Sequence, residues 1–451
     1  MVHTLSDVPV APGQLPVLGH LIPFARDPIG FLGGLRAHGD LVEINLAGKH
    51  MFVPSRTESL REILVNEARN FDKGYLFERF RVILGNGLLT STGEFHRRQR
   101  KIVQPAFHRE QIAGYTDAVR EEITETVGPW PARGWLDLCP TMQEMTFQVV
   151  TTVLFAAKLG KHERQRFRHA MTVALRGLIL RAYSPLPFLE RLPTPGNQRF
   201  ENAVSTVRTI LDDVVAAHRR GGDEPGGLLS LLLDTSESEQ DHHVLDEQLR
   251  DEVVSIITAG TETAAGTLSW LFYELARNPD LERRLHQEVD DKLGGRPVEL
   301  GDIAGLEFVS WLLNETLRRY TPNWILTRRT INPVVISGTR LEPNTEMLFS
   351  LTTVHRDPNL FTEPYRFDPD RWSPERSATL PRGVFMPFGA GNRKCVGDSF
   401  AWTVMVVAVA TIAQRWRVVV ADPTKVREQP RATLQPKGLV GKLVQRRDTA
   451  V

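Results

Sequence analysis

Residues 388–397 read Phe388-Gly-Ala-Gly-Asn-Arg-Lys-Cys395-Val-Gly397, a glycine-rich segment whose cysteine stands just before an apolar helical pattern. The unpaired N–H groups at a helix start carry a partial positive charge, which stabilises a thiolate. The glycines let the backbone approach a flat ligand without a Cβ clash. Arg393 can reach an anionic group on that ligand. The segment therefore favours a thiolate bound to a flat, anionic, metal-bearing cofactor.

Three interpretations of Cys395 compete on the residues alone. An iron–thiolate bond to haem suits the segment better than a nucleophile, because a Cys–His site needs a base and none is indicated. Gly389 and Gly391 resemble the start of a dinucleotide loop, but Lys394 occupies its third glycine position. The interpretation of Cys395 as a buried structural thiol after a turn remains open at this point.

Composition excludes several classes of protein. The 451 residues carry 55 Lys+Arg against 54 Asp+Glu, and this net charge of +1 argues against nucleic-acid binding. Cys139 and Cys395 are the two cysteines, too few for a disulfide scaffold or a four-cysteine zinc site, and they fit a reducing cytosol. No apolar stretch reaches the roughly 20 residues that span a bilayer. We expect a soluble, cytoplasmic protein without a transmembrane segment or signal peptide, in which the proline-rich segment 15–24 is buried rather than membrane-bound.

Hydrophobic periodicity predicts a mainly α fold with a minor β portion. We expect one large domain over residues 1–451, with a short proline-rich segment at 1–20. A capping box at Ser55 and Glu58 is expected to open a helix at Leu60–Asn66. The other main expectations are a hairpin at Leu41–Leu46 and His50–Pro54, helices at Leu249–Arg277, Glu307–Tyr320 and Asp398–Gln414, and strands at Thr327–Ile336 and Glu346–Leu351.

The segment around Cys395 resembles the signature F-x-x-G-x-R-x-C-x-G of the cytochrome P450 haem-thiolate monooxygenases. The match falls on Phe388, Gly391, Arg393, Cys395 and Gly397. Three further motifs occur in the family's order, so the resemblance runs from about Pro12 to Val444. It implies the P450 fold, with heme b between the long central helix and the cysteine loop and with Cys395 as the iron ligand.

The second motif is Glu315-Thr-Leu-Arg318, an i,i+3 pair that can form an ion pair on one helix face. Taken alone, such a pair is usually a solvated surface contact. The resemblance implies instead the E-x-x-R pair of the family, completed by Arg371 in the segment Phe367–Trp372. The implied role of this triad is structural, because it fixes the loop that holds the cysteine.

The third motif is Ala259-Gly-Thr-Glu262-Thr263, in the middle of a long helix. A packed helix with a polar stripe would explain it without any chemistry. The resemblance implies that this acid–alcohol pair crosses the haem face where dioxygen binds, with Thr263 as hydrogen-bond partner and Glu262 in the proton relay. Many members have Asp where this chain has Glu262. The pair argues against a gas-binding haem protein without oxygenase activity, and against a peroxide-using or isomerising enzyme.

The fourth motif is His96-Arg-Arg-Gln-Arg100, in which His96 and Arg100 lie on the same helix face. Exposed basic helix turns are usually only solvated. The resemblance implies that both residues bind the haem propionates together with Arg328 and Arg393. Arg328 has Arg329 as its neighbour, so either of these two arginines is a candidate.

The resemblance also implies an apolar substrate pocket above the haem. Its expected lining is Phe77, Phe80, Ile83, Leu84, Leu178, Ile257, Ala259, Trp324 and Ile325. Such a pocket accepts hydrocarbon-like molecules. We expect a terpene hydrocarbon ahead of a fatty acid or macrolide, because the segments Pro9–His20 and Phe388–Ala401 are similar to those of bacterial sesquiterpene oxidases.

The chain carries no flavin or iron–sulfur motif, so its electrons must come from other proteins. The resemblance implies a ferredoxin and an NAD(P)H-dependent ferredoxin reductase, with dioxygen as co-substrate and the enzyme as a monomer. An acidic ferredoxin is expected to dock on Arg97, Arg98, Lys101 and Lys394.

Overall fold

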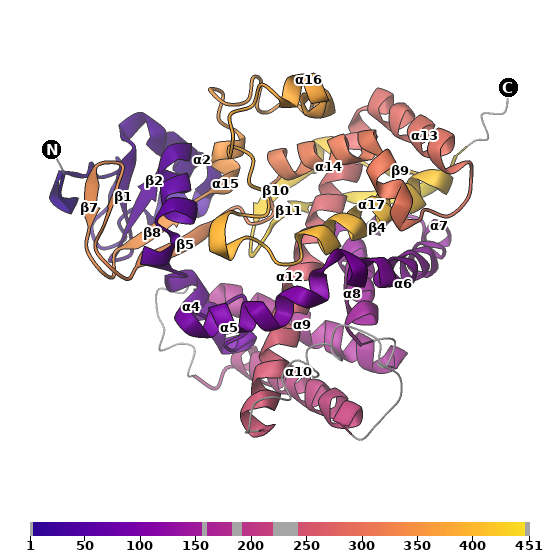
Figure 1. The fold of residues 1–451 in the computed structure, drawn as a ribbon, viewed down its shortest axis with the longest axis horizontal. Helices are drawn as coiled ribbons and strands as arrows, with labels where there is room; N and C mark the ends of the chain where they lie inside the picture. Colours follow the sequence, from indigo (N-terminus) through magenta and orange to yellow (C-terminus); the bar gives the residue numbers. More distant parts are fainter. Residues whose placement is uncertain (1–2, 156–159, 183–191, 220–241, 447–451) are drawn as a thin grey trace.

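The computed structural model describes residues 3–155, 160–182, 192–219 and 242–446, in which helices dominate (Figure 1). The mainly α fold with a minor β portion is confirmed. The longer helices are α4 (Tyr75–Leu84), α5 (Gly93–Val103), α6 (Arg109–Val127), α8 (Leu138–Phe155), α9 (Lys161–Ala182), α10 (Pro195–Arg219), α12 (His242–Arg277), α13 (Pro279–Leu293), α14 (Glu307–Arg319) and α17 (Asp398–Arg415). The shorter ones are α1 (Leu21–Arg26), α2 (Pro28–Gly34), α3 (Thr57–Arg61), α7 (Trp130–Arg133), α15 (Leu351–His355) and α16 (Pro374–Ser377).

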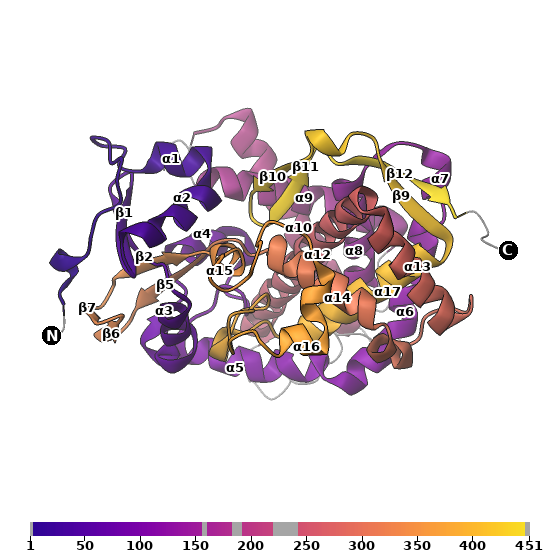
Figure 2. The ribbon, with the colours of Figure 1, turned by 90° about the horizontal axis from the view of Figure 1, so that it is seen from above.

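Helix α12 crosses the middle of the molecule (Figures 1 and 2) and packs against α8, α14 and α17. From Ala264 to Leu275 every residue is buried, because this stretch consists almost entirely of small and apolar side chains. Residues 404–410 of α17 are buried for the same reason. Each fully buried Leu or Val contributes roughly 1.5–3 kcal/mol relative to an exposed one, so this contact fixes α17 against the central helix.

The largest sheet lies at one end of the molecule, in the order β1-β2-β8-β5-β3 (Figure 1). The predicted hairpin is confirmed, with Val42 opposite Val53. The strands of this sheet are β1 (Leu41–Leu46), β2 (Lys49–Pro54), β3 (Phe71–Asp72), β5 (Leu326–Thr330) and β8 (Glu346–Phe349). Smaller sheets contain β4 (Leu136–Asp137), β9 (Trp416–Val420) and β12 (Val440–Gln445), the pair β6 (Val334–Ile336) and β7 (Thr339–Leu341), and the pair β10 (Arg427–Pro430) and β11 (Leu434–Lys437).

Two local expectations are wrong. Ser55 does not cap a helix, because its hydroxyl donates to the Gly39 carbonyl at 2.5 Å and α3 begins at Thr57 without a side-chain cap. The single strand expected at Thr327–Ile336 is two strands in different sheets. Pro333 lies between them, and it has no backbone N–H to continue a ladder.

The proline-rich segment 15–24 is not buried as a whole. His20 and Phe24 are buried, and the His20 imidazole lies 2.8 Å from the Ala11 carbonyl. Val17 and Ile22, in contrast, are 90% and 52% exposed, so the expected burial is wrong for this tip. Within the described ranges, no helix has the length and apolar character needed to cross a membrane.

Candidate functional site

The cysteine segment folds back on itself before α17 begins. The Cys395 N–H donates to the Phe388 carbonyl at 2.9 Å, and the Lys394 N–H donates to the Gly391 carbonyl at 3.1 Å. Gly391 has φ +68°, and a Cβ there would lie 1.8 Å from the Leu64 carbonyl oxygen. Only glycine fits this position. The signature residues therefore build a tight loop that holds Cys395 just before α17.

The Cys395 thiol is accessible, although protein surrounds the loop. Burial, with a smaller contribution from Asp398, raises its pKa, although the Gly397 N–H, Arg100 and Lys394 lower it. The helix start that the sequence singled out therefore does not by itself make a thiolate here. A bound metal ion would do so, since coordination deprotonates a thiol.

Basic side chains from four parts of the chain interact electrostatically beside this loop. Arg100 joins the loop to α5, because its Nη1 donates to the Lys394 carbonyl at 2.8 Å. Arg393 donates to the Ser91 carbonyl at 2.9 Å and pairs with Asp72 at 3.1 Å. The members of this group, called the cation cluster below, are Lys73, His96, Arg100, Arg328 and Arg393.

Burial and mutual repulsion disfavour every charge in the cation cluster whose pKa is shifted. The pKa of His96 falls to about 3 through burial and the charges of Arg393 and Lys73. Burial, then the neighbouring charge of Arg393, lowers the pKa of Arg328 to about 10. Burial lowers the pKa of Arg393 to about 10 as well, although Asp72 opposes the shift.

Arg328, and not Arg329, belongs to the cation cluster. Neighbouring residues of a strand point to opposite faces. Arg328 is 6% exposed, whereas Arg329 turns outward to pair with Glu78 and Glu346. The alternation of β5 thus resolves the choice between the two arginines that the sequence left open.

The sequence did not single out Lys73. Its side chain is buried, and its Nζ lies 4.3 Å from the centre of the Phe77 ring. Burial and the charges of Arg328 and Arg393 lower the pKa of Lys73 far below its ordinary value. No local sequence pattern predicts that Lys73 belongs to the cation cluster, because a lysine before a helix is ordinarily solvated.

The cation cluster fits the two carboxylates of haem. Among the described residues, Asp72 is the acidic partner that opposes the pKa shifts of Lys73, Arg328 and Arg393. Buried cations with so little compensation favour a multiply charged anion. An accessible thiol stands next to them on the same loop as Arg393. This donor set, one soft sulfur ligand and several anion-binding groups, suits an iron porphyrin with propionates.

The structure brings Glu315, Arg318 and Arg371 together in the interior. Glu315 and Arg318 form a two-pronged ion pair at 2.8 and 2.9 Å, and Arg371 lies 3.4 Å from the same carboxylate. Trp372 donates to Glu315 at 3.1 Å, and the Asp368 N–H donates at 2.9 Å. Below, these groups are called the Glu315 network.

His355 couples the Glu315 network to the chain just before the cysteine loop. The Arg318 guanidinium donates to the His355 carbonyl at 2.8 Å. The His355 Nε2 accepts the Met386 N–H at 3.0 Å, and its Nδ1 lies 2.7 Å from the Thr321 hydroxyl. Since a backbone N–H can only donate, the imidazole carries its proton on Nδ1. The sequence identified His355 only as part of a loop.

The acid–alcohol pair lies in the middle of α12. The Thr263 hydroxyl donates to the Ala259 carbonyl at 2.7 Å, and Ala259 itself is exposed although α12 crosses the interior. Glu262 accepts two contacts of 3.2 Å from the Gln143 amide of α8, and it also accepts a hydrogen bond from the Gln435 amide of β11. The two glutamines are partners that the sequence did not reveal.

The expected pocket residues come from four separate parts of the chain. Phe77 and Phe80 of α4 contact each other edge to face, with their rings 6.0 Å apart. Trp324 is buried, and its indole donates to the Arg431 carbonyl at 2.8 Å. The side chains of Ile83 and Leu178 lie outside the described residues. Leu84, Ile257 and Ile325 are buried.

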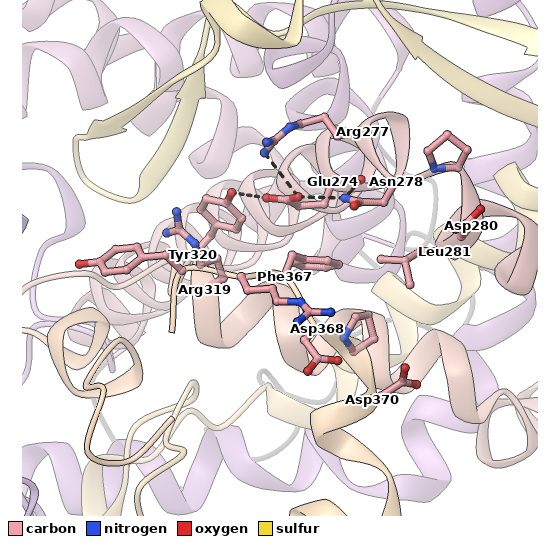
Figure 3. Close-up of a pocket in the computed structure, with 14 residues that line it drawn as sticks. Glu274, Arg277, Asn278, Asp280, Leu281, Arg319, Tyr320, Phe367, Asp368 and Asp370 are labelled. Carbon is pink, nitrogen blue, oxygen red and sulfur yellow. Dashed lines mark hydrogen bonds and ion pairs between the residues drawn. The ribbon is translucent and has the colours of Figure 1, made fainter. Parts of the chain in front are cut away.

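A cleft of about 540 Å³ lies elsewhere, between the start of α13, the end of α14 and residues 365–370 (Figure 3). Charged side chains dominate its wall, where Glu274 pairs with Arg277 and accepts a hydrogen bond from Tyr320. Among the described residues, no predicted site residue lines it. Its charge does not suit an apolar substrate.

Comparisons with known proteins show which proteins the chain resembles in sequence and fold. The family profile described as Cytochrome P450 matches residues 9–442. The chain is 39% identical to cyclooctat-9-en-7-ol 5-monooxygenase of Streptomyces melanosporofaciens over 90% of its own length and 89% of the relative. It is 39% identical to pentalenene oxygenase of Streptomyces avermitilis over 94% of both chains. Among solved structures, the heme domain of a cytochrome P450DA mutant superposes with a TM-score of 0.85 at 23% identity, covering 98% of both chains.

Proposed function

The chain belongs to the cytochrome P450 family and is a haem-dependent monooxygenase, and we propose that it hydroxylates a terpene. Two relatives whose names specify terpene substrates, at 39% identity over nearly the whole chain, support this substrate class. The observation that carries the site assignment is the cation cluster beside an accessible Cys395. When bound, haem would activate dioxygen, from which one oxygen atom enters the substrate and the other leaves as water.

We propose that Cys395 is the iron ligand and that the cation cluster binds the propionates. Propionates would remove much of the repulsion that lowers the pKa of His96 and Arg328. Arg100 and Arg393 hold the loop through backbone carbonyls as well, so cofactor binding and loop geometry depend on the same side chains.

We propose that Thr263 would position a proton donor at the face of α12 where haem would be held. Its own O–H is committed to the Ala259 carbonyl, which leaves its oxygen lone pairs as acceptors. Glu262 is the neighbouring proton source, and the amides of Gln143 and Gln435 hold its carboxylate by hydrogen bonds. Thr263→Ala and Glu262→Gln should each lower the product formed per dioxygen consumed. Undiminished coupling in both variants would contradict this role.

We propose that a ferredoxin and its NAD(P)H-dependent reductase supply the electrons to a monomeric, cytoplasmic enzyme. Arg97, Arg98 and Lys101 are exposed on α5, and Lys394 is exposed on the loop that Arg100 ties to α5. An acidic partner would be steered to this face, so turnover should fall steeply with added salt. A rate independent of ionic strength would argue against this docking face.

The test of the proposed function uses the haem-loaded enzyme. Reduced wild-type protein with carbon monoxide should give the difference spectrum of a thiolate-ligated haem, and Cys395→Ser should abolish it. Optical titration should then show a spin-state shift with pentalenene or cyclooctat-9-en-7-ol. A shift with long-chain fatty acids alone would replace the terpene by a fatty acid, and turnover with peroxide but not with a ferredoxin system would indicate a peroxide-using enzyme.

A further inference from the structure

Two acidic residues of α12 lie well before the acid–alcohol pair and have no role in the chemistry proposed above. Asp251 accepts the N–H of Asn86 at 2.7 Å, and Glu252 accepts the N–H of Leu88 at 2.9 Å. Both donors are backbone groups of the loop between α4 and α5. The two carboxylates therefore hold one short piece of main chain against the central helix.

Hydrogen bonds within the loop also hold its residues together. The Thr90 hydroxyl donates to the Gly85 carbonyl at 2.7 Å, and the N–H groups of Thr90 and Ser91 donate to the Gly87 carbonyl at 3.0 and 2.9 Å. Arg81 of α4 adds a contact of 3.1 Å to the Thr90 carbonyl. Residues 85–91 are thus one hydrogen-bonded unit, called the 85–91 loop below.

The main chain of this loop approaches α12 too closely for any side chain. A Cβ on Gly87 would lie 2.4 Å from both the Asp251 carbonyl oxygen and the Ser255 hydroxyl. Gly85 has φ +55°, and its Cβ would lie 1.9 Å from the Asp251 carboxylate. The contact is therefore built for glycine at both positions.

The far end of the 85–91 loop reaches the candidate haem site. The Ser91 carbonyl accepts a hydrogen bond from Arg393 at 2.9 Å. One end is thus tied to α12 and the other to the cysteine loop.

The 85–91 loop directly follows the expected pocket residue Leu84, and Glu252 lies one to two turns before the expected pocket residue Ile257 on α12. We propose that Asp251 and Glu252 are positioning residues that clamp the 85–91 loop to α12 and so set one wall of the substrate pocket; this rests on the pocket expected for the proposed function.

The electrostatics agree with a buried clamp. Burial raises the pKa of Glu252 to about 7, against the Leu88 N–H, which lowers it. Burial also raises the pKa of Asp251 to about 6, while the Asn86 N–H lowers it. A neutral amide at either position keeps an acceptor oxygen for the loop N–H, so Glu252→Gln and Asp251→Asn are conservative variants.

The test compares two nitrogen ligands of haem iron, imidazole and the larger 4-phenylimidazole, by optical titration of the haem-loaded protein. Glu252→Ala should weaken 4-phenylimidazole binding by up to about tenfold, the effect expected for one lost hydrogen bond, and leave imidazole binding within about twofold. Glu252→Gln should restore wild-type affinity. Gly87→Ala should reproduce the effect of Glu252→Ala without touching a carboxylate.

Glu288 provides the matched control. Its carboxylate also accepts two backbone N–H groups of another element, from Phe308 at 2.7 Å and Val309 at 2.9 Å, but it joins α13 to α14. Glu288→Ala should lower the Tm as Glu252→Ala does, without changing the affinity for either azole. Equal azole affinities in Glu252→Ala and Glu288→Ala would overturn the proposal.

Hydrogen exchange separates this proposal from the proposed function. Glu252→Ala should raise amide exchange in a peptide that covers residues 85–91, and Glu288→Ala should not. If wild-type enzyme shows no shift with pentalenene or cyclooctat-9-en-7-ol, the terpene assignment fails while the azole and exchange results still decide the clamp. Unchanged exchange in Glu252→Ala would show that the carboxylate does not hold the loop.

Discussion

The Glu315 network and the cation cluster both bury arginine side chains, but they differ in what surrounds those side chains. Arg318 meets a carboxylate through two hydrogen bonds and donates to the carbonyls of His355 and Pro364 at 2.8 and 2.9 Å. Arg328 instead donates to the Thr327 carbonyl at 2.8 Å and lies among other cations. The Glu315 network is internally compensated, whereas among the described residues only Asp72 opposes the pKa shifts of the cation cluster.

This difference separates a structural role from a binding role. A buried charge is stable only when nearby opposite charge and hydrogen bonds replace its hydration. The Glu315 network meets that condition with protein groups alone, so we propose that its role is in folding. The cation cluster does not, and its lowered pKa values indicate where an anionic ligand belongs.

The largest expected effect comes from breaking the compensated network. Glu315→Gln leaves Arg318 and Arg371 buried without a counter-charge, and the loss of one partner of such a pair costs about 3–5 kcal/mol. We expect poor folding or a large fall in the free energy of unfolding, measured by urea denaturation.

The control for this variant is an exposed carboxylate on the same segment. Asp370 pairs with Arg284 at 2.7 Å, and both side chains are nearly half exposed. Asp370→Asn should change the free energy of unfolding by about 0–1 kcal/mol. Similar losses of unfolding free energy in Glu315→Gln and Asp370→Asn would show that the Glu315 network stabilises the fold no more than a surface ion pair does.

A smaller effect is expected from the cation cluster, and it should appear in cofactor binding. Arg328→Met removes one charge-assisted contact to a propionate, worth roughly 1.5–3 kcal/mol, so the transfer of haem to apomyoglobin should accelerate about 10- to 100-fold. Arg329→Met is the matched control, because Arg329 faces away and pairs with Glu78 and Glu346. Equal haem loss from both variants would contradict the assignment of the cluster.

The sequence predicted the elements of the fold better than the partners inside it. The periodicity of α12 and α17 and the hairpin β1–β2 were evident, because long apolar patterns and short turns are local properties. The predicted strand through Pro333 failed because its apolar pattern continued across a residue that cannot pair. Capping at Ser55 failed because a distant carbonyl, that of Gly39, competes for its hydroxyl.

Sequence motifs identified the main residues of the candidate site, and the tertiary contacts of the structure identified their partners. Cys395 and Glu315 belong to sequence motifs whose residue types and spacing are distinctive. Lys73, Gln143 and Gln435 stand in no motif, and only the packing of separate elements brings them to the site. Buried partners contributed by other helices and strands leave no local signature.

His355, which contacts the Glu315 network, and His96 of the cation cluster should contribute differently to the loss of stability in acid. Burial, then the charges of Arg318 and Arg356, lower the pKa of His355 from 6.5 to about 3. As the pH falls below about 6.5, the unfolded chain takes up a proton that folded His355 does not. Its contribution to stability is therefore complete above pH 6.5 and is lost progressively down to about pH 3, by at most about 1.4 kcal/mol per pH unit.

His355→Gln should reduce the loss of folding stability in acid. The measurement is the slope of the urea midpoint against pH between about pH 5 and 7. His96→Gln should reduce this loss less in the haem-loaded protein. Bound propionates would raise the pKa of His96 back toward 6.5, whereas among the described residues only burial and the cations Arg318 and Arg356 shift the pKa of His355. Identical slopes in the two variants would show that the clusters do not differ in this way.

The smallest expected effect is at Asp72, the carboxylate that pairs with Arg393 at 3.1 Å. If the cation cluster binds propionates, Asp72→Asn removes one counter-charge from Arg393 but also removes repulsion between Asp72 and the propionates. These changes oppose each other, so haem transfer to apomyoglobin should change by less than about threefold, well under the effect of a lost charge-assisted contact. If no anion bound there, Asp72 would be essential to the cluster, and its loss would destabilise the protein as strongly as Glu315→Gln.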